Sequence, residues 1–376
     1  MADLEAALRP FVDSGDIPGL VALVARGGDV EVVALGRQGT SGTPMARGSI
    51  FRGASITKPM TAAVTLALVE DGLVDLDAPV GELLPELAEP RVLRTLGSPL
   101  DDTVPCERPV TARHLLTGTA GHGFCTWDSP VPDRLMAELG QAADDIHEVP
   151  PPDEWMSRLS AIPLMHQPGD GWTYNASYDV LGVLVARAAG RDFAQVMAER
   201  LLEALGMTDT GFHVPTDRLD RLTTMYGSDD GELGVRDEPD GYFTRPPAFA
   251  SGSGGLVTTV DDWLAFGRML LADGGDVLRP ESVQLMTTDH TTPQHRDMGG
   301  FFLDGQGWGF GGGVDTELID PWNVLGRYGW VGGTGTSAYV HPSTGVVAVL
   351  LTQVVLGAPG VEDVLKAFWT VSAQVS

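Results

Sequence analysis

The two ends of the chain carry the same strand-turn-strand pattern, and this most constrains the fold. Residues 20–26 and 30–36 are apolar, β-branched runs separated by Gly27-Gly28-Asp29, which predicts an antiparallel hairpin. Residues 337–341 and 346–353 repeat the pattern around a Pro-Ser-Thr-Gly turn, and residues 361–371 follow with helical periodicity. Strands at both ends with helices between them predict an α+β protein, an antiparallel sheet flanked by terminal helices and interrupted by an inserted segment.

The middle of the chain supplies the helices. Residues 61–70 continue a helix that begins near Ser55, with one apolar face formed by Met60, Val64, Ala67 and Leu68. Further helices are expected over residues 111–116, 178–190 and 193–205. We therefore expect a discontinuous α/β sheet domain of residues 1–75 and 245–376, a mostly helical domain of residues 76–244, and an active site at their interface.

Charge and composition exclude some partners. A net charge of −27 disfavours nucleic acid, because a polyanion would be repelled. No apolar run approaches the roughly 20 residues that span a bilayer. Residues 1–10 have the pattern of an amphipathic helix and not of an export signal, which predicts a cytoplasmic protein. Cys106 and Cys125 are too few for a disulfide scaffold and are expected to be reduced.

The segment Ser55-Ile56-Thr57-Lys58 places a hydroxyl and an amine three residues apart at an expected helix start. Residues at this spacing share one helix face. A desolvated amine beside the positive end of a helix has a lowered pKa, so neutral Lys58 can take the serine proton. The chain contains only two lysines, Lys58 and Lys366, and an arginine at position 58 could not lose a proton. For the tetrapeptide alone, chance occurrence on a helix surface is the better interpretation.

Several further segments follow in a fixed order. Together with Ser55 to Lys58 they resemble the penicillin-recognising serine hydrolases, a superfamily of β-lactamases, D-Ala-D-Ala peptidases and related esterases. The resemblance implies a β-lactamase/transpeptidase-like fold of the class C-like branch. The segments that carry it are residues 51–80, 110–121, 167–182, 204–212, 254–259 and 330–336.

Within this resemblance Tyr174 corresponds to the tyrosine that assists the nucleophile and the leaving group as a phenolate or through a shared proton. An ordinary tyrosine pKa near 10 makes a poor base unless a cation stabilises the anion, and Lys58 is the expected cation. The two groups would then titrate as a coupled pair. Taken alone, Tyr174 reads better as a core tyrosine with a satisfied hydroxyl.

The segment over residues 330–336 departs from the lactamase pattern. Where β-lactamases carry Lys or His, then Thr or Ser, then Gly, this chain has Trp330-Val331-Gly332. The tryptophan resembles that of the β-lactamase-fold carboxylesterases and predicts an apolar wall for an uncharged acyl or alcohol group. Gly332 and Gly333 permit close backbone approach, so the N–H groups of Gly333 and Ser55 are expected to form the oxyanion hole.

A second departure lies beside Tyr174. The lactamase motif has an asparagine two residues after the tyrosine, but here that position is Ala176 and the asparagine is Asn175. Recognition of a substrate amide is therefore not predicted. Thr334 and Ser337 are candidates for the missing polar contacts, with sheet hydroxyls facing solvent as an equal alternative. The expected substrate-binding residues are Asn175, Trp330, Gly332 and Thr334.

Other chemistries find little support in the sequence. Neither Ser55 nor Ser253 lies in a Gly-x-Ser-x-Gly motif, and the histidines show no paired ligand spacing, so neither a metal nor a cofactor is expected. The sequence predicts a serine hydrolase that cleaves small-molecule carboxylic esters through an acyl-enzyme. The alternatives are a β-lactamase, D-amino-acid amidase or D-Ala-D-Ala peptidase, an acyltransferase that uses the same acyl-enzyme, and a non-catalytic binding module.

Overall fold

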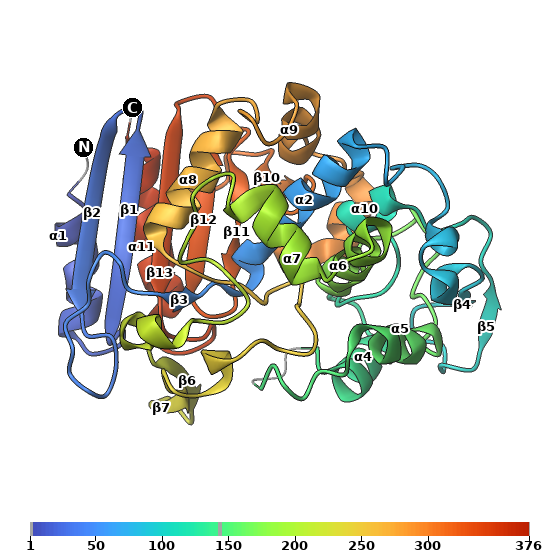
Figure 1. The fold of residues 1–376 in the computed structure, drawn as a ribbon, viewed down its shortest axis with the longest axis horizontal. Coiled ribbons are helices and arrows are strands. Elements are labelled where there is room, and N and C mark those ends of the chain that lie inside the picture. Colours follow the sequence, from blue (N-terminus) through green and yellow to red (C-terminus); the bar gives the residue numbers. More distant parts are fainter. Residues whose placement is uncertain (1–2, 142–144, 376) are drawn as a thin grey trace.

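Figure 1 shows the computed structural model of the protein, which describes residues 3–141 and 145–375. Its main sheet has seven strands in the order β2-β1-β13-β12-β11-β10-β9, and every neighbouring pair is antiparallel. Both predicted hairpins are confirmed, and β1 pairs with β13, so the two ends of the chain meet in the sheet. The strands are β1 (Gly19–Arg26), β2 (Asp29–Gly36), β9 (Gln306–Trp308), β10 (Gly313–Asp315), β11 (Tyr328–Gly332), β12 (Thr336–His341) and β13 (Val346–Thr352).

Both faces of the sheet are buried, which explains why its central strands are apolar at nearly every position. Alternate residues of a strand point to opposite faces. On β1, Leu20, Ala22 and Val24 pack toward the terminal helices α1 (Leu4–Asp13) and α11 (Val361–Ala373). Val21 and Leu23 belong to the larger core on the other face, where α8 (Val260–Leu271) covers the sheet (Figure 1).

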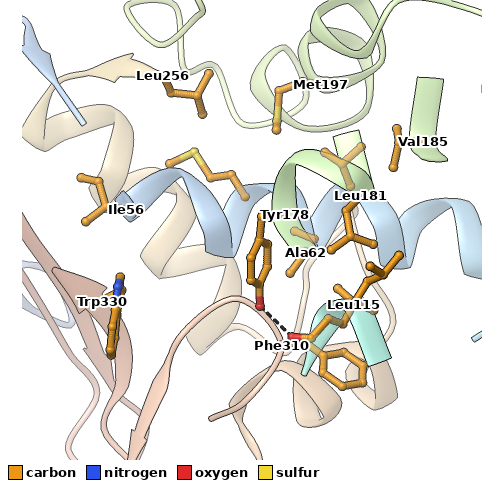
Figure 2. Packing of buried hydrophobic residues seen from close by; sticks show 14 of the residues in the cluster. Ile56, Ala62, Leu115, Tyr178, Leu181, Val185, Met197, Leu256, Phe310 and Trp330 are labelled. Atoms are coloured by element: carbon orange, nitrogen blue, oxygen red, sulfur yellow. Dashed lines mark hydrogen bonds between the residues drawn. The ribbon is translucent and has the colours of Figure 1, made fainter. Parts of the chain in front are cut away.

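The helix that carries the Ser-Lys pair is more buried than its sequence pattern predicts. Helix α2 (Lys58–Glu70) is buried at every position from Lys58 to Leu68, so the expectation of a single apolar face on Met60, Val64, Ala67 and Leu68 was wrong. Its small Ala and Thr residues let neighbours pack on all sides, because short side chains permit close approach of helices. Figure 2 shows Ala62 of α2 beside Tyr178, with Leu181 and Val185 of α6 (Ala176–Ala189) close by.

Most of the remaining helices lie on the side of the molecule away from the chain termini (Figure 1). The predicted helix over residues 193–205 is α-helical only to Met197 and then widens into a π turn over residues 198–202. The domain boundaries at residues 75/76 and 244/245 stay predictions. The other helices are α3 (Ala112–Leu116), α4 (Val131–Leu139), α5 (Pro152–Ser160), α7 (Phe193–Met197), α9 (Pro280–Thr287) and α10 (Pro293–Gly299).

Three small two-stranded sheets complete the fold. The pair β3 (Phe51–Arg52) and β8 (Val257–Thr258) lies next to the Ser-Lys segment. The other pairs are β4 (Arg91–Leu93) with β5 (Thr103–Pro105), and β6 (Met225–Asp229) with β7 (Glu232–Asp237).

The N-terminal helix was expected over residues 1–10, and α1 begins at Leu4, where the Asp3 side chain accepts a hydrogen bond from the Ala6 N–H at 3.0 Å. Met1 and Ala2 lie outside the described residues. Within residues 3–141 and 145–375, no helix combines the length and the apolar character needed to cross a membrane. Both cysteines are free.

Candidate active site

The nucleophile candidate Ser55 lies on a short turn between a strand and a helix. Strand β3 pairs with β8, residues 54–57 form a 3-10 turn, and α2 begins at Lys58. Ala54, just before the serine, has a φ of 46°, a left-handed conformation that is uncommon for a residue with a side chain. Such conformations concentrate at functional sites. Ser55 and Ala54 line a cavity of about 400 Å³.

The amine of Lys58 is completely buried and has three oxygen neighbours. Its Nζ lies 2.8 Å from Ser55 Oγ, 2.8 Å from Asn175 Oδ1 and 2.7 Å from the main-chain oxygen of Ser253. Burial lowers the pKa of Lys58 to about 7, against the opposing effect of the Asp179 charge. A neutral amine has two hydrogens, and the carbonyl oxygens of Asn175 and Ser253 can only accept. The lone pair of neutral Lys58 therefore faces the Ser55 hydroxyl.

Tyr174 lies beside the same amine, but aromatic rings surround it. Lys58 Nζ is 4.5 Å from the centre of the Tyr174 ring, and Phe302 stacks on the ring at 4.6 Å. Burial raises the pKa of Tyr174 to about 12, and hydrogen bonding with Ser55 and Trp330 opposes part of that rise. The expected phenolate stabilised by Lys58 is therefore disfavoured: above pH 7 the amine is uncharged and offers the phenolate no cation.

The structure places Trp330 behind Tyr174 and not on the cavity wall. Its indole Nε1 donates a hydrogen bond to the Tyr174 hydroxyl oxygen at 2.7 Å, and its ring packs edge-on against Trp308 at 4.6 Å. Figure 2 shows Trp330 on its strand, among the buried residues of the core. The prediction of an apolar wall that contacts substrate was wrong, because β11 turns this side chain inward onto the tyrosine. Trp330 orients the Tyr174 hydroxyl instead.

The glycines after Trp330 bring the strand against the nucleophile turn. A Cβ on Gly332 would lie 2.4 Å from the main-chain oxygen of Gly53, so this position packs against the turn and leaves no room for a side chain. Gly333 lines the cavity together with Ser55, and the assignment of their N–H groups to an oxyanion hole stays a prediction. Thr334 also lines the cavity, but its hydroxyl donates to the main-chain oxygen of Arg52 at 2.6 Å.

Ser337 lies away from the cavity. Its hydroxyl accepts a hydrogen bond from Trp369 of α11 at 2.8 Å. The suggestion that Ser337 supplies a polar contact to substrate was wrong, because alternate residues of β12 face opposite sides of the sheet.

The cavity combines apolar walls with a polar floor. The floor is formed by Ser55, Gln141, Asn175, Asp179, Ser251 and Ser253. The apolar side chains around it come from segments far apart in the sequence: Phe124, Leu139, Ile146, Val149, Trp155, Met225, Phe243, Pro247, Phe249 and Val355. Such a lining suits a ligand with one reactive polar group and an apolar body.

Four residues of this floor were absent from the sequence-based site: Gln141, Asp179, Ser251 and Ser253. Asp179 is only 1% exposed and accepts hydrogen bonds from the other three. One signal was available, since Asp179 precedes the apolar run Val180 to Val185 in a helix, and a buried carboxylate needs partners. The sequence offered no means to say which partners these were.

Asn175 has a role that its sequence position did not reveal. Its backbone is left-handed, with φ 86° and ψ −74°, and this conformation brings its amide under the Lys58 amine. The amide oxygen faces Lys58 and the amide nitrogen donates to Gln141 Oε1 at 2.7 Å. Both ends of the amide are thus bound by protein groups, which weakens the prediction that Asn175 binds substrate.

Comparison with known proteins agrees with this geometry. The family model described as Beta-lactamase matches residues 4–366. The chain belongs to the Beta-lactamase family. Protein Rv1367c of Mycobacterium tuberculosis is 37% identical over 93% of this chain and 89% of its own length. The lovastatin esterase of Penicillium rubens is 32% identical over 95% of this chain and 94% of its own length.

A solved structure shares the whole architecture. EstCE1, described as a hydrolase with promiscuous acyltransferase activity, has a TM-score of 0.80 and 26% identity, and the match covers 99% of this chain and 97% of EstCE1. The predicted β-lactamase/transpeptidase-like fold is thereby confirmed. As a member of the Beta-lactamase family with esterase relatives, this protein is a serine hydrolase.

Proposed function

We propose that this Beta-lactamase family member cleaves neutral carboxylic esters through an acyl-enzyme on Ser55. The observation that carries the proposal is the arrangement at Lys58, where two carbonyl oxygens hold the amine hydrogens and the lone pair faces Ser55 Oγ at 2.8 Å. A buried amine with a pKa of about 7 is largely neutral at pH 8. It is a base matched to its operating pH, as general-base catalysis requires.

In the acylation step Ser55 Oγ attacks the ester carbonyl carbon and its proton passes to Lys58 Nζ. The N–H groups of Ser55 and Gly333 stabilise the oxyanion of the tetrahedral intermediate. When the carbon–oxygen bond of the ester breaks, the departing alkoxide takes a proton from the Tyr174 hydroxyl. The Lys58 ammonium then returns a proton to Tyr174, so both groups end the step neutral.

In the deacylation step water attacks the acyl carbon and gives one proton to Lys58. The tetrahedral intermediate collapses, the carboxylic acid leaves, and the Ser55 oxygen takes the proton back from Lys58. The enzyme returns to its starting state, and no cofactor is needed to balance either step.

The charges of the cavity favour a neutral substrate. Among the described lining residues Arg52 is the cation, and its guanidinium is already held by Asp237 and by the main-chain oxygen of Thr223. The position that carries Lys or His in β-lactamases is Trp330, which is bound to Tyr174. A substrate carboxylate such as that of a β-lactam therefore lacks a cationic partner, whereas an apolar ester does not need one.

Acyl transfer is the second candidate. EstCE1, which shares the fold along almost the whole chain, is described as a hydrolase with promiscuous acyltransferase activity. The apolar cavity walls of the present protein would likewise hold an alcohol against the acyl-enzyme. Both reactions share the first half-reaction, so the acceptor that enters second decides the product.

The test compares wild type with Ser55→Ala on p-nitrophenyl butyrate and nitrocefin, with intact-mass detection of a fluorophosphonate adduct. We expect ester turnover and a single adduct for wild type, and loss of both for Ser55→Ala. Ser372→Ala, which removes a buried serine of α11 on the far side of the sheet, is the control and should behave as wild type. Wild-type turnover in Ser55→Ala, or nitrocefin turnover exceeding ester turnover, would contradict the proposal.

A further inference from the structure

Asp179 is a buried carboxylate beneath the catalytic amine. It lies in the first turn of α6, is 1% exposed, and accepts four hydrogen bonds. The donors are Ser251 Oγ at 2.7 Å, Ser253 Oγ at 2.9 Å, the Ser253 N–H at 3.1 Å and Gln141 Nε2 at 2.6 Å. Both oxygens of the carboxylate are thus occupied by protein donors. No substrate contact is needed to explain it.

The first connection from Asp179 to the amine runs through two amides. Asp179 can only accept, so Gln141 must turn its NH₂ toward it and its oxygen toward Asn175. Asn175 must then turn its NH₂ toward Gln141 and its oxygen toward Lys58 Nζ. The direction of each hydrogen bond from Asp179 through Gln141 and Asn175 to Lys58 therefore follows from the carboxylate at one end.

The second connection runs through the main chain of Ser253. Asp179 binds the N–H and the hydroxyl of Ser253, and the carbonyl oxygen of the same residue lies 2.7 Å from Lys58 Nζ. Both residues that hold the amine hydrogens are thus bound to the Asp179 carboxylate, Ser253 directly and Asn175 through the amide of Gln141.

We propose that Asp179 is a positioning residue for the reaction: it fixes both acceptors of Lys58 so that the amine lone pair faces Ser55, and its charge acts on the amine from below. The inference rests on the proposed function, since it assigns a role in activating the same Ser55. It also adds a group whose hydrogen bonds go to Gln141, Ser251 and Ser253 and not to Ser55 or Lys58.

The other groups near the amine leave Asp179 as the counter-charge. Lys58 Nζ faces the rings of Tyr174 at 4.5 Å and Tyr178 at 5.9 Å, both of which are neutral because burial raises their pKa values. Arg52 lines the same cavity but is paired with Asp237. A negative charge favours the ammonium form, so removal of the Asp179 charge should lower the pKa of Lys58 further.

The test uses Asp179→Asn and exploits the lysine content of the chain. Because Lys58 and Lys366 are the only lysines, protein labelled with ¹⁵N at lysine Nζ gives two side-chain signals, with exposed Lys366 as internal reference. We expect the Lys58 titration of Asp179→Asn to move about one pH unit lower than in wild type. We also expect the plateau kcat on p-nitrophenyl butyrate to fall about tenfold through loss of alignment, with KM nearly unchanged.

The matched control is Asp262→Asn, which neutralises another buried carboxylate that is hydrogen-bonded to Thr210 and Asp209 away from the cavity. It should leave both the titration and kcat unchanged. A uniform loss of activity in Asp179→Asn with an unmoved Lys58 titration would indicate a merely structural role and overturn the proposal. Wild-type kcat with a wild-type titration would overturn it as well.

If Asp179→Asn does not fold, Gln141→Met tests the amide connection while it keeps the carboxylate. We expect a lower plateau kcat with the Lys58 titration close to that of wild type, and a wild-type kcat would overturn this part of the proposal. The NMR titration needs no turnover, so it tests the role of Asp179 separately from the proposed esterase function. An enzyme inactive on esters whose Lys58 titration still depends on Asp179 would contradict the proposed function alone.

Discussion

Lys58 and Tyr174 are neighbours, Lys58 completely buried and Tyr174 partly buried at the cavity, and their surroundings differ in kind. The amine meets three oxygens and, beyond them, the Asp179 carboxylate. The phenol meets Phe302 and Trp330, and its oxygen accepts the indole N–H of Trp330. Burial moves their pKa values in opposite directions, to about 7 for Lys58 and about 12 for Tyr174.

In the proposed mechanism, this difference lets one site hold a base and an acid side by side. Burial penalises the charged form of each group, so the lysine loses its proton easily and the tyrosine keeps its own. Around pH 8 the site therefore contains a neutral amine and a neutral phenol, which would not be so if the pair formed an ammonium–phenolate ion pair. The oxygens of the floor direct the amine, and the aromatic rings keep the phenol protonated.

The largest loss of activity is expected when the amine of Lys58 is removed. Lys58→Met removes the amine but keeps an apolar chain of similar length, and kcat/KM on p-nitrophenyl butyrate should fall about 10³-fold, within the range typical of a positioned base. Lys366→Met, on the exposed face of α11, is the matched control and should retain wild-type kcat/KM. A loss of less than tenfold in Lys58→Met would mean that another group accepts the Ser55 proton.

Removal of the acid should cost less and should depend on the leaving group. Tyr174→Phe keeps the ring but not the hydroxyl, and kcat/KM for an alkyl butyrate should fall about 10²-fold. p-Nitrophenyl butyrate should be affected much less, because p-nitrophenolate leaves without protonation. Equal losses on both esters would assign Tyr174 to the activation of Ser55 and not to leaving-group protonation.

The pH dependence of kcat/KM for the wild-type enzyme tests the pKa values of both Lys58 and Tyr174. Neutral Lys58 is the active form, so kcat/KM should rise with pH, about tenfold per pH unit below pH 7, and level off above it. Because the Tyr174 pKa is about 12, no second ionisation of this site should lower activity up to pH 10. A bell-shaped profile with a fall near pH 8 or 9 would show that the phenol ionises within the working range.

The smallest effect is expected when the hydrogen bond from the Trp330 indole to the Tyr174 hydroxyl is removed. Trp330→Phe keeps the aromatic packing but removes the indole N–H, and since one such bond is worth about 1 kcal/mol, kcat for alkyl esters should fall about fivefold. KM should stay near its wild-type value, because the indole lies behind Tyr174 and not on the cavity wall. A change confined to KM would restore the prediction that Trp330 contacts substrate.

Much of the fold and part of the site were predictable because local patterns carry them. The hairpins at the two ends, the helix after Ser55 and the Ser-Lys pair follow from periodicity, turn residues and spacing within a few residues. The orientation of Trp330 was not predictable in this way. Whether its side chain faces a ligand or the core depends on the register of β11 against β12 and on Tyr174, 156 residues earlier in the chain.

By itself the sequence determined that the Ser55 hydroxyl and the Lys58 amine lie together, because their hydrogen bond spans only three residues and needs little more than a helix start. Only the tertiary structure decided how that base is tuned. The carboxylate of Asp179, the amides of Asn175 and Gln141 and the carbonyl of Ser253 come from separate segments that folding brings together around one buried amine. Desolvation and charge act through space, so their effect on Lys58 has no signature in the residues next to it along the chain.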